Sequence, residues 1–170
     1  MRQVFEGNAW VFGDHVNTDQ ILPGRFLDRP AEEVGRYALV GLDEIFPDRV
    51  APGDFVVGGV NFGCGSSRET AVLALKQAGV SAVIARSFAR IFFRNAINNG
   101  FPAVIIGDTA EIRQGDRLRL DLSARTVTDL RTGAVLPVQN LTGTSLEILQ
   151  HGGIVAYTLA RIGGRGGQTP

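Results

Sequence analysis

The sequence FVVGGVNFGCGSSRETAVLALKQAG, residues 55–79, contains the pattern that decides the fold. It begins with an apolar segment, residues 55–60, that is typical of a buried strand. A loop rich in glycine and serine follows, and the next apolar pattern predicts a helix over residues 66–78 that ends at Gly79. A strand, a polar loop and a helix therefore follow one another within 25 residues.

The segments after residue 79 repeat this order of elements. Residues 80–85 are apolar and β-branched, which predicts a second buried strand. Apolar residues at helical spacing over 88–97 predict a helix ending at Gly100, and residues 103–106 predict a third strand. This strand–helix alternation favours an α/β fold with a parallel sheet and right-handed crossovers.

The flanking segments indicate additional elements. We expect a strand over 9–12, an extended segment over 16–22 and a helix from Pro30 to about residue 39. Residues 117–122 alternate strictly, and a turn at 131–133 joins two further strands, 127–130 and 135–138, in a hairpin. A short helix is expected over 145–150. These patterns alone predict an α/β domain with an antiparallel extension.

The length of 170 residues fits one domain with a substantial core. We assign the domain to residues 1–162, and the glycine-rich residues 163–170 predict a disordered tail. No internal repeat or interdomain linker is evident.

Composition excludes several classes of function. The 17 basic and 17 acidic residues balance, which argues against nucleic-acid or membrane-surface binding. A single cysteine cannot form an internal disulfide, which suits a reducing cytoplasm, and it cannot anchor an iron–sulfur cluster. With only His15 and His151, a self-contained zinc site is not expected either. The sequence shows no signal segment and no run of apolar residues long enough to span a membrane.

The glycine- and serine-rich loop is the main candidate site. It places Ser66, Ser67 and Arg68 at a helix N-terminus, where free N–H groups favour a bound anion. The loop lacks the spacing of phosphate-binding or dinucleotide-binding motifs, and Arg68 suits a carboxylate. The structural alternative is a capping box between Ser66 and Glu69. Residue types and spacing favour a functional anion-binding site over a purely structural capping box, but they leave both interpretations open.

Other polar groups have simpler explanations. The cluster over residues 13–20 by itself suits a polar turn and a helix cap. Cys64 has no basic neighbour in sequence and is expected to be a half-buried thiol. His151 suits the C-terminus of a helix. Three phenylalanines, at positions 88, 92 and 93, are expected in the core.

Three ordered blocks together resemble the small, swivel-domain subunits of the aconitase superfamily, in the group of archaeal-type 3-isopropylmalate dehydratases and homoaconitases. The blocks are GDHVNTDQILP at 13–23, NFGCGSSRE at 61–69 and ALKQAGVSAVIARSFARIFFRNAINNG at 74–100. Their order and separation match over nearly the whole chain except the tail. The resemblance implies a swivelling β/β/α domain with a barrel-like mixed sheet, as in the aconitase C-terminal domain.

The resemblance also implies an activity and a partner. In this family a large subunit carries a [4Fe–4S] cluster, so this chain itself is expected to bind no cofactor. The pair would isomerise a 2-hydroxy di- or tricarboxylate by dehydration and rehydration, and 3-isopropylmalate in leucine biosynthesis is the leading substrate. Homoaconitate-type and 2,3-dimethylmalate-type substrates are alternatives, and a non-catalytic carboxylate-binding module is a further one. The isolated chain could also form a homo-oligomer.

The resemblance assigns roles to individual residues. Ser66 would act as the base, as an alkoxide, while Ser67 and Arg68 would bind a substrate carboxylate. Asp19 would orient a histidine of the large subunit.

Two positions depart from the family pattern. Thr70 stands where many relatives have histidine, which leaves any role of that position open. The loop after Pro23-Gly24, which reads the variable group of the substrate in relatives, contains Asp28 and Arg29 where isopropylmalate-type loops are apolar. Arg29 could bind a distal carboxylate, or it could be a solvated charge or a partner of Asp28 or Glu32.

Overall fold

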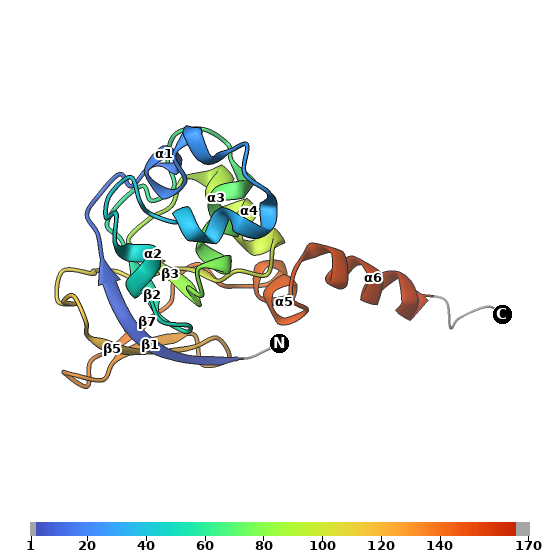
Figure 1. Cartoon of the computed structure of the whole chain (residues 1–170). Coiled ribbons are helices and arrows are strands. Elements are labelled where there is room, and N and C mark those ends of the chain that lie inside the picture. The colour runs from blue at the N-terminus through green and yellow to red at the C-terminus, as the bar shows by residue number, and fades with distance from the viewer. Residues whose placement is uncertain (1–2, 166–170) are drawn as a thin grey trace.

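A mixed seven-stranded sheet, in the order β4-β3-β2-β1-β5-β6-β7, forms the body of the protein in a computed structural model that describes residues 3–165 (Figure 1). The sheet is curled into a half-barrel, the fold class that the family resemblance implied. Four strands are parallel: β1 (Val4–Val11), β2 (Phe55–Val57), β3 (Ala82–Ala85) and β4 (Ala103–Ile105). Three are antiparallel: β5 (Arg117–Asp121), β6 (Thr126–Asp129) and β7 (Val135–Pro137).

Strand β1 joins the two halves of the sheet. Its C-terminal half pairs in parallel with β2, with Ala9 opposite Phe55, and its N-terminal half pairs antiparallel with β5, with Val4 opposite Asp121. The sequence predicted only the second half of β1, because the apolar run starts at Ala9. The predicted parallel alternation and the C-terminal hairpin are both confirmed.

Helices connect and cover the strands. Two of them, α3 (Glu69–Gln77) and α4 (Arg90–Asn98), follow β2 and β3 as predicted. The predicted helix near residue 30 is a 3-10 helix, η2 (Ala31–Tyr37). The remaining helices are η1 (Gly24–Phe26), α2 (Phe46–Arg49), α5 (Thr144–Gln150) and α6 (Ile154–Arg165), together with α1, described below.

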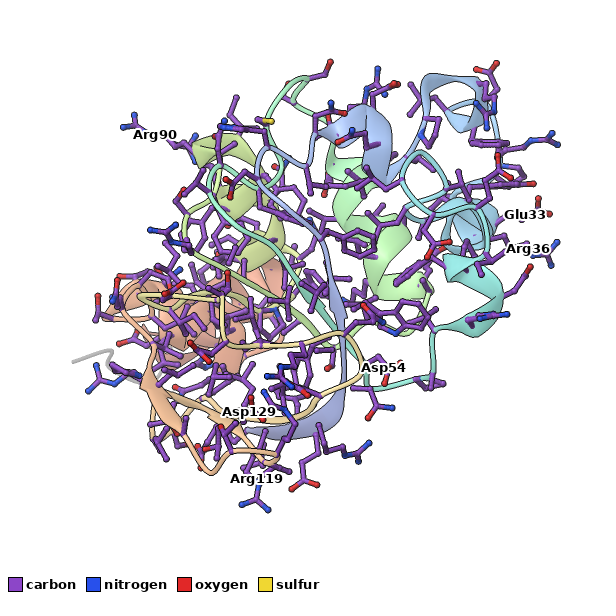
Figure 2. The ribbon with its side chains drawn as sticks, turned by 90° about the vertical axis from the view of Figure 1, so that its left-hand side faces the viewer. Glu33, Arg36, Asp54, Arg90, Arg119 and Asp129 are labelled. Carbon is purple, nitrogen blue, oxygen red and sulfur yellow. The ribbon has the colours of Figure 1, made fainter. Side chains whose placement is uncertain are left out.

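Alternation along the parallel strands produces one apolar core on each face of the sheet. Val56 and Val83 pack with helices α3 and α4, whereas Phe55 and Ile84 pack with the antiparallel strands and α5. The strands are buried on both faces, which explains why they are continuously apolar in sequence. Buried Asp54 lies directly before β2 (Figure 2). It accepts hydrogen bonds from the Asn8 amide and the Trp10 indole, both at 2.9 Å.

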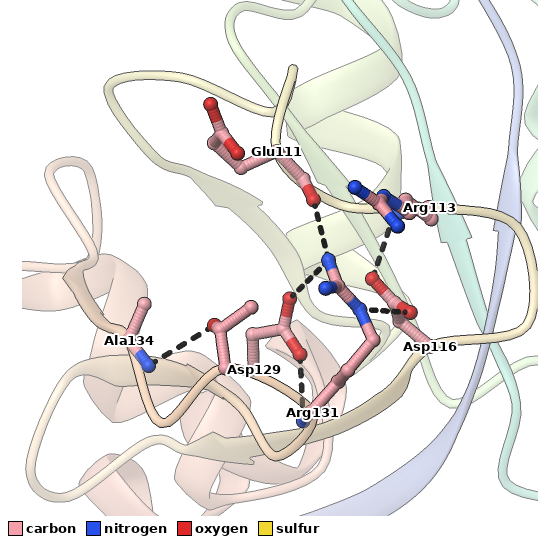
Figure 3. A network of polar contacts seen from close by, with 7 residues as sticks. Glu111, Arg113, Asp116, Asp129, Arg131 and Ala134 are labelled. Atoms are coloured by element: carbon pink, nitrogen blue, oxygen red, sulfur yellow. Dashed lines mark hydrogen bonds and ion pairs between the residues drawn. The ribbon is translucent and has the colours of Figure 1, made fainter.

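A second polar network fixes the antiparallel end of the sheet (Figure 3). Arg131 Nε donates to Asp116 at 2.8 Å, and its Nη2 lies 3.8 Å from Asp129 and donates to the Glu111 carbonyl at 3.1 Å. The hydrogen bond from Arg131 lowers the pKa of Asp116, against the opposing effect of burial, and the Arg113 amide lowers it further. The network therefore ties the β6–β7 turn to the loop before β5.

One predicted element is wrong. The sequence predicts an extended segment over residues 16–22, but these residues contain the helix α1 (Thr18–Ile21). The Asn17 side chain accepts from the Gln20 amide at 2.8 Å, and the Gln20 side chain accepts from the Asn17 amide at 3.0 Å. This capping box stabilises a turn too short to show helical periodicity.

The C-terminal helix α6 extends away from the body (Figure 1). The sequence patterns did not predict it, and it continues to Arg165, three residues into the segment predicted to be a disordered tail. The rest of that segment, 166–170, lies outside the described residues. Within residues 3–165, no helix is long and apolar enough to cross a bilayer.

Candidate functional site

Two loops that are distant in sequence form the candidate site. The loop after β1 and the loop after β2 pair through their backbones, because the Gly63 amide donates to the Val16 carbonyl at 2.7 Å and the Thr18 amide donates to the Cys64 carbonyl at 2.8 Å. The first and second sequence blocks therefore lie against each other at the carboxyl ends of parallel strands, where open α/β sheets commonly bind ligands.

The paired loops contain two residues in the left-handed backbone conformation. His15 and Asn61 have positive φ angles of 55° and 57°, and asparagine and histidine adopt this region more readily than most other residues with a Cβ atom. Their side chains lie 3.3 Å apart, between Nδ1 of His15 and Nδ2 of Asn61. The Asn61 amide also donates to Ser87 Oγ at 2.7 Å, and the Val60 amide donates to Asp14 at 2.8 Å. These hydrogen bonds fix the backbone conformation of the loop that leads to residue 66.

Aromatic side chains of the third sequence block pack against the loop after β2. Phe62 contacts Phe88 and Phe92 edge-to-face, with ring centroids 6.0 and 5.4 Å away. Phe88, Phe92 and Phe93 all pack against the α3-side core, which confirms the prediction made for them. Together with Phe62, these rings form an aromatic layer that fixes the position of the loop relative to α4.

The serine hydroxyls are free in the structure. Ser66 and Ser67 are exposed, and within residues 3–165 neither hydroxyl has a hydrogen-bond partner. Helix α3 begins at Glu69, with Arg68 as an N-cap that makes no side-chain cap. Glu69 instead accepts from Asn99 Nδ2 at 3.0 Å. The capping box considered for Ser66 and Glu69 is therefore absent, and the helix starts three residues later than predicted.

Arg68 and Asp19 meet although they are 49 residues apart. Arg68 Nη1 lies 3.4 Å from Asp19 Oδ1 and 3.4 Å from the Leu22 carbonyl, while the Gly24 amide donates to the same Asp19 oxygen at 3.0 Å. The Arg68 side chain is 24% exposed and that of Asp19 is 70% exposed. Among the described residues, the other guanidinium nitrogens of Arg68 have no partner, so they remain available to an anion.

Arg29 belongs to a different arrangement. Phe26 and Tyr37 stack with ring centroids 4.1 Å apart, and Arg25 and Arg29 lie over the rings of this pair, at 4.6 and 5.8 Å from the centroids of Phe26 and Tyr37 respectively. In the described part of the chain, Arg29 forms no ion pair with Asp28 or Glu32, and it makes no polar contact with residues 66–68. Its guanidinium is thus held by an aromatic ring at the edge of the loop.

The position of Asp19 depends on a helix that the apolar pattern does not predict. The carboxylate lies on α1, whose start is fixed by Asn17 and Gln20. The Asn-x-x-Gln spacing was a detectable signal of a helix start. Contact between Asp19 and Arg68 had no comparable signal.

Two other expectations are confirmed. Cys64 is half-buried, and His151 caps the C-terminus of α5, where its Nδ1 lies 2.8 Å from the Glu147 carbonyl. Over residues 3–165, no group of three or more histidine, cysteine, aspartate or glutamate side chains could hold a metal ion. The residues present therefore do not fit an iron–sulfur cluster held by this chain alone.

Comparisons with known proteins agree with this architecture. A family model for the aconitase C-terminal domain matches residues 42–106. The chain is 49% identical over 160 residues to the isopropylmalate/citramalate isomerase small subunit of Methanocaldococcus jannaschii, an alignment that covers 92% of this chain and 95% of the relative. It is 45% identical over 159 residues to the methanogen homoaconitase small subunit of the same organism, covering 93% of each.

A crystal structure of 3-isopropylmalate dehydratase from Methanocaldococcus jannaschii aligns with a TM-score of 0.90 and 43% identity, covering 96% of this chain and 99% of that one. The curled sheet and the paired loops thus define a small subunit of an aconitase-type hydro-lyase. The chain belongs to the family of 3-isopropylmalate dehydratase and homoaconitase small subunits.

Proposed function

We propose that this chain acts with a large subunit to isomerise 3-isopropylmalate by dehydration and rehydration, as a step of leucine biosynthesis in the cytoplasm. The names of relatives that are 49% and 48% identical support this substrate class. We assign the [4Fe–4S] cluster, which would bind the substrate hydroxyl, to the large subunit. The roles proposed below concern residues of this chain alone.

The observation that carries the proposal is the free Ser66 hydroxyl, in the loop three residues before α3. A base must remove a proton from the carbon next to a substrate carboxylate, and Ser66 Oγ is committed to no protein partner in the described structure. A serine alkoxide needs positive potential around it. In this proposal the first amides of α3 and the Arg68 guanidinium, both close to Ser66 in sequence, would supply it.

Ser67 and Arg68 bind the carboxylate in this proposal. Removing the proton builds negative charge on that group, so donors already in place stabilise the transition state more than the substrate. Asp19 holds Arg68 from one side and remains largely exposed, which leaves it accessible to a histidine of the large subunit.

Replacing Ser66 tests the role of the base. With the large subunit present, Ser66→Ala is expected to lower kcat by roughly 10²–10⁴, the usual contribution of a general base. Ser123→Ala, an exposed serine in the β5–β6 turn, is the matched control and is expected to keep full activity. Activity retained by Ser66→Ala with assembly intact would contradict the assignment. If no cluster-bearing subunit associates with the wild-type chain, the alternative of a non-catalytic carboxylate-binding module is favoured.

A homoaconitase-type substrate is the second candidate, because a relative of that name is 45% identical and the loop contains a basic residue at position 29. Arg29 could leave Tyr37 to bind a distal carboxylate. We expect Arg29→Ala to lower kcat/KM for tricarboxylates by about tenfold or more, the effect of losing a charge-assisted hydrogen bond, and to spare isopropylmalate and citramalate. Equal effects on all substrates would show that Arg29 has only a structural role.

A further inference from the structure

A cavity with both polar and apolar lining residues, separate from residues 66–68, lies between α4 and α5. It has a volume of about 270 Å³. The two helices pack against each other, and the cavity opens along their contact. Its lining residues are Arg90, Phe93, Arg94, Ile97, Asn98, Thr144, Ser145 and Ile148.

The charged side chains that line this cavity are all positive. Arg90 and Arg94 lie one turn apart on α4, and no acidic residue lines the cavity. Neither arginine forms an ion pair or hydrogen bond within residues 3–165. Two like charges at this spacing destabilise a helix, and Arg90 adds a cation at the positive end of the helix dipole. A bound anion would remove both unfavourable interactions.

The other lining groups define the shape of the ligand. The Asn98 amide and the Thr144 and Ser145 hydroxyls also lack partners among the described residues, so five polar side chains without an intramolecular partner line the cavity. Phe93 is half-buried, and Ile97 and Ile148 are 4% and 7% exposed, which gives the cavity an apolar wall. Figure 2 shows Arg90 at the outer edge of the molecule, so the charged end of the cavity is open to solvent.

We propose that this cavity binds a small organic phosphate. The phosphate group would lie between Arg90 and Arg94 and accept from the hydroxyls, because its several oxygens can accept from more donors than a carboxylate can. The organic part of the ligand would contact Phe93 and Ile148. The proposal does not depend on the function assigned to Ser66 and Arg68.

Phenyl phosphate is a suitable probe, with the full-length chain observed by amide-resolved NMR. We expect saturable shifts at residues 90–98 and 144–148 with a dissociation constant in the millimolar range or below. Arg90→Gln and Arg94→Gln should each weaken this binding about tenfold or more, as expected for loss of a charge-assisted hydrogen bond. Arg117→Gln, which replaces an exposed arginine on β5, should leave it unchanged.

Phenyl phosphate could also bind at the N-terminus of α3, so Arg68→Gln is included. The proposal requires that the shifts at residues 90–98 persist in this variant. Shifts confined to residues 66–70, equal binding by Arg94→Gln and the wild type, or equal shifts with neutral benzyl alcohol would each overturn it. Unchanged spectra outside the cavity would show that the arginine variants fold.

Discussion

Gly63 occupies a position where one methyl group would collide with the core. Its φ is +82°, and a Cβ atom there would lie 2.2 Å from Cγ of Phe92. The aromatic layer that supports the candidate site therefore requires glycine at this residue, for space as well as for backbone conformation.

Gly63→Ala is expected to lower the free energy of unfolding by roughly 2–5 kcal/mol, from the left-handed backbone and the overpacked ring together. Gly115→Ala is the matched control, since Gly115 has a φ of +85° and a Cβ atom added there would meet nothing within 4 Å. The control should lose only roughly 1–2 kcal/mol. Urea denaturation measures both, and equal losses would show that contact with Phe92 is unimportant.

Helix α1 is the element that determines where the Asp19 carboxylate lies. It has four residues, too few to be stable without its capping box. Gly24, the first residue of η1, follows shortly after the end of α1, and its amide donates to Asp19. Capping of α1 is thus connected to the arrangement around Arg68.

Asn17→Ala should destabilise the protein by about 1 kcal/mol, the usual cost of losing an N-cap. Asn17→Asp should retain most of that stability, because aspartate caps helices as well as asparagine does. Thermal unfolding of the two variants measures the difference. Equal stability of both variants and the wild type would mean that the Asn17 side chain does not hold the helix.

At the scale of the whole molecule, the network around Asp116 makes stability depend on pH. The pKa of Asp116 is lowered in the folded state, mainly by the hydrogen bond from Arg131, so the unfolded chain binds more protons at low pH. The stabilisation is fully present above the pKa of an aspartate in the unfolded chain, about 4, and is lost as the pH falls through the lower pKa of Asp116 in the folded state.

Asp116→Asn should therefore flatten the fall of stability below about pH 4, where the ordinary aspartate pKa lies, relative to the wild type. Asp28→Asn is the control, because this exposed carboxylate has no partner among the described residues. Urea unfolding as a function of pH measures the slopes. If the free energy of unfolding falls with the same slope at acid pH in the wild type and in Asp116→Asn, Asp116 does not cause the pH dependence.

Local sequence determined much of this protein. Apolar runs and their spacing predicted β2, α3, β3, α4 and β4, because periodicity reports burial within a few residues. Strict alternation predicted β5, and the turn residues predicted the β6–β7 hairpin. The ordered blocks identified the family and the candidate residues Ser66, Ser67 and Arg68.

Only the tertiary structure decided how these pieces function together. Residue types allowed a capping box at Ser66, whereas packing starts α3 at Glu69, binds Glu69 to Asn99 and leaves the serine free. Packing also brings Asp19 to Arg68 across 49 residues and holds Arg29 over Tyr37. Periodicity and turn chemistry act over a few residues, whereas contacts between distant loops depend on the whole sheet. Local sequence patterns therefore indicated most of the elements and the family, and the fold decided which polar groups remain free to act.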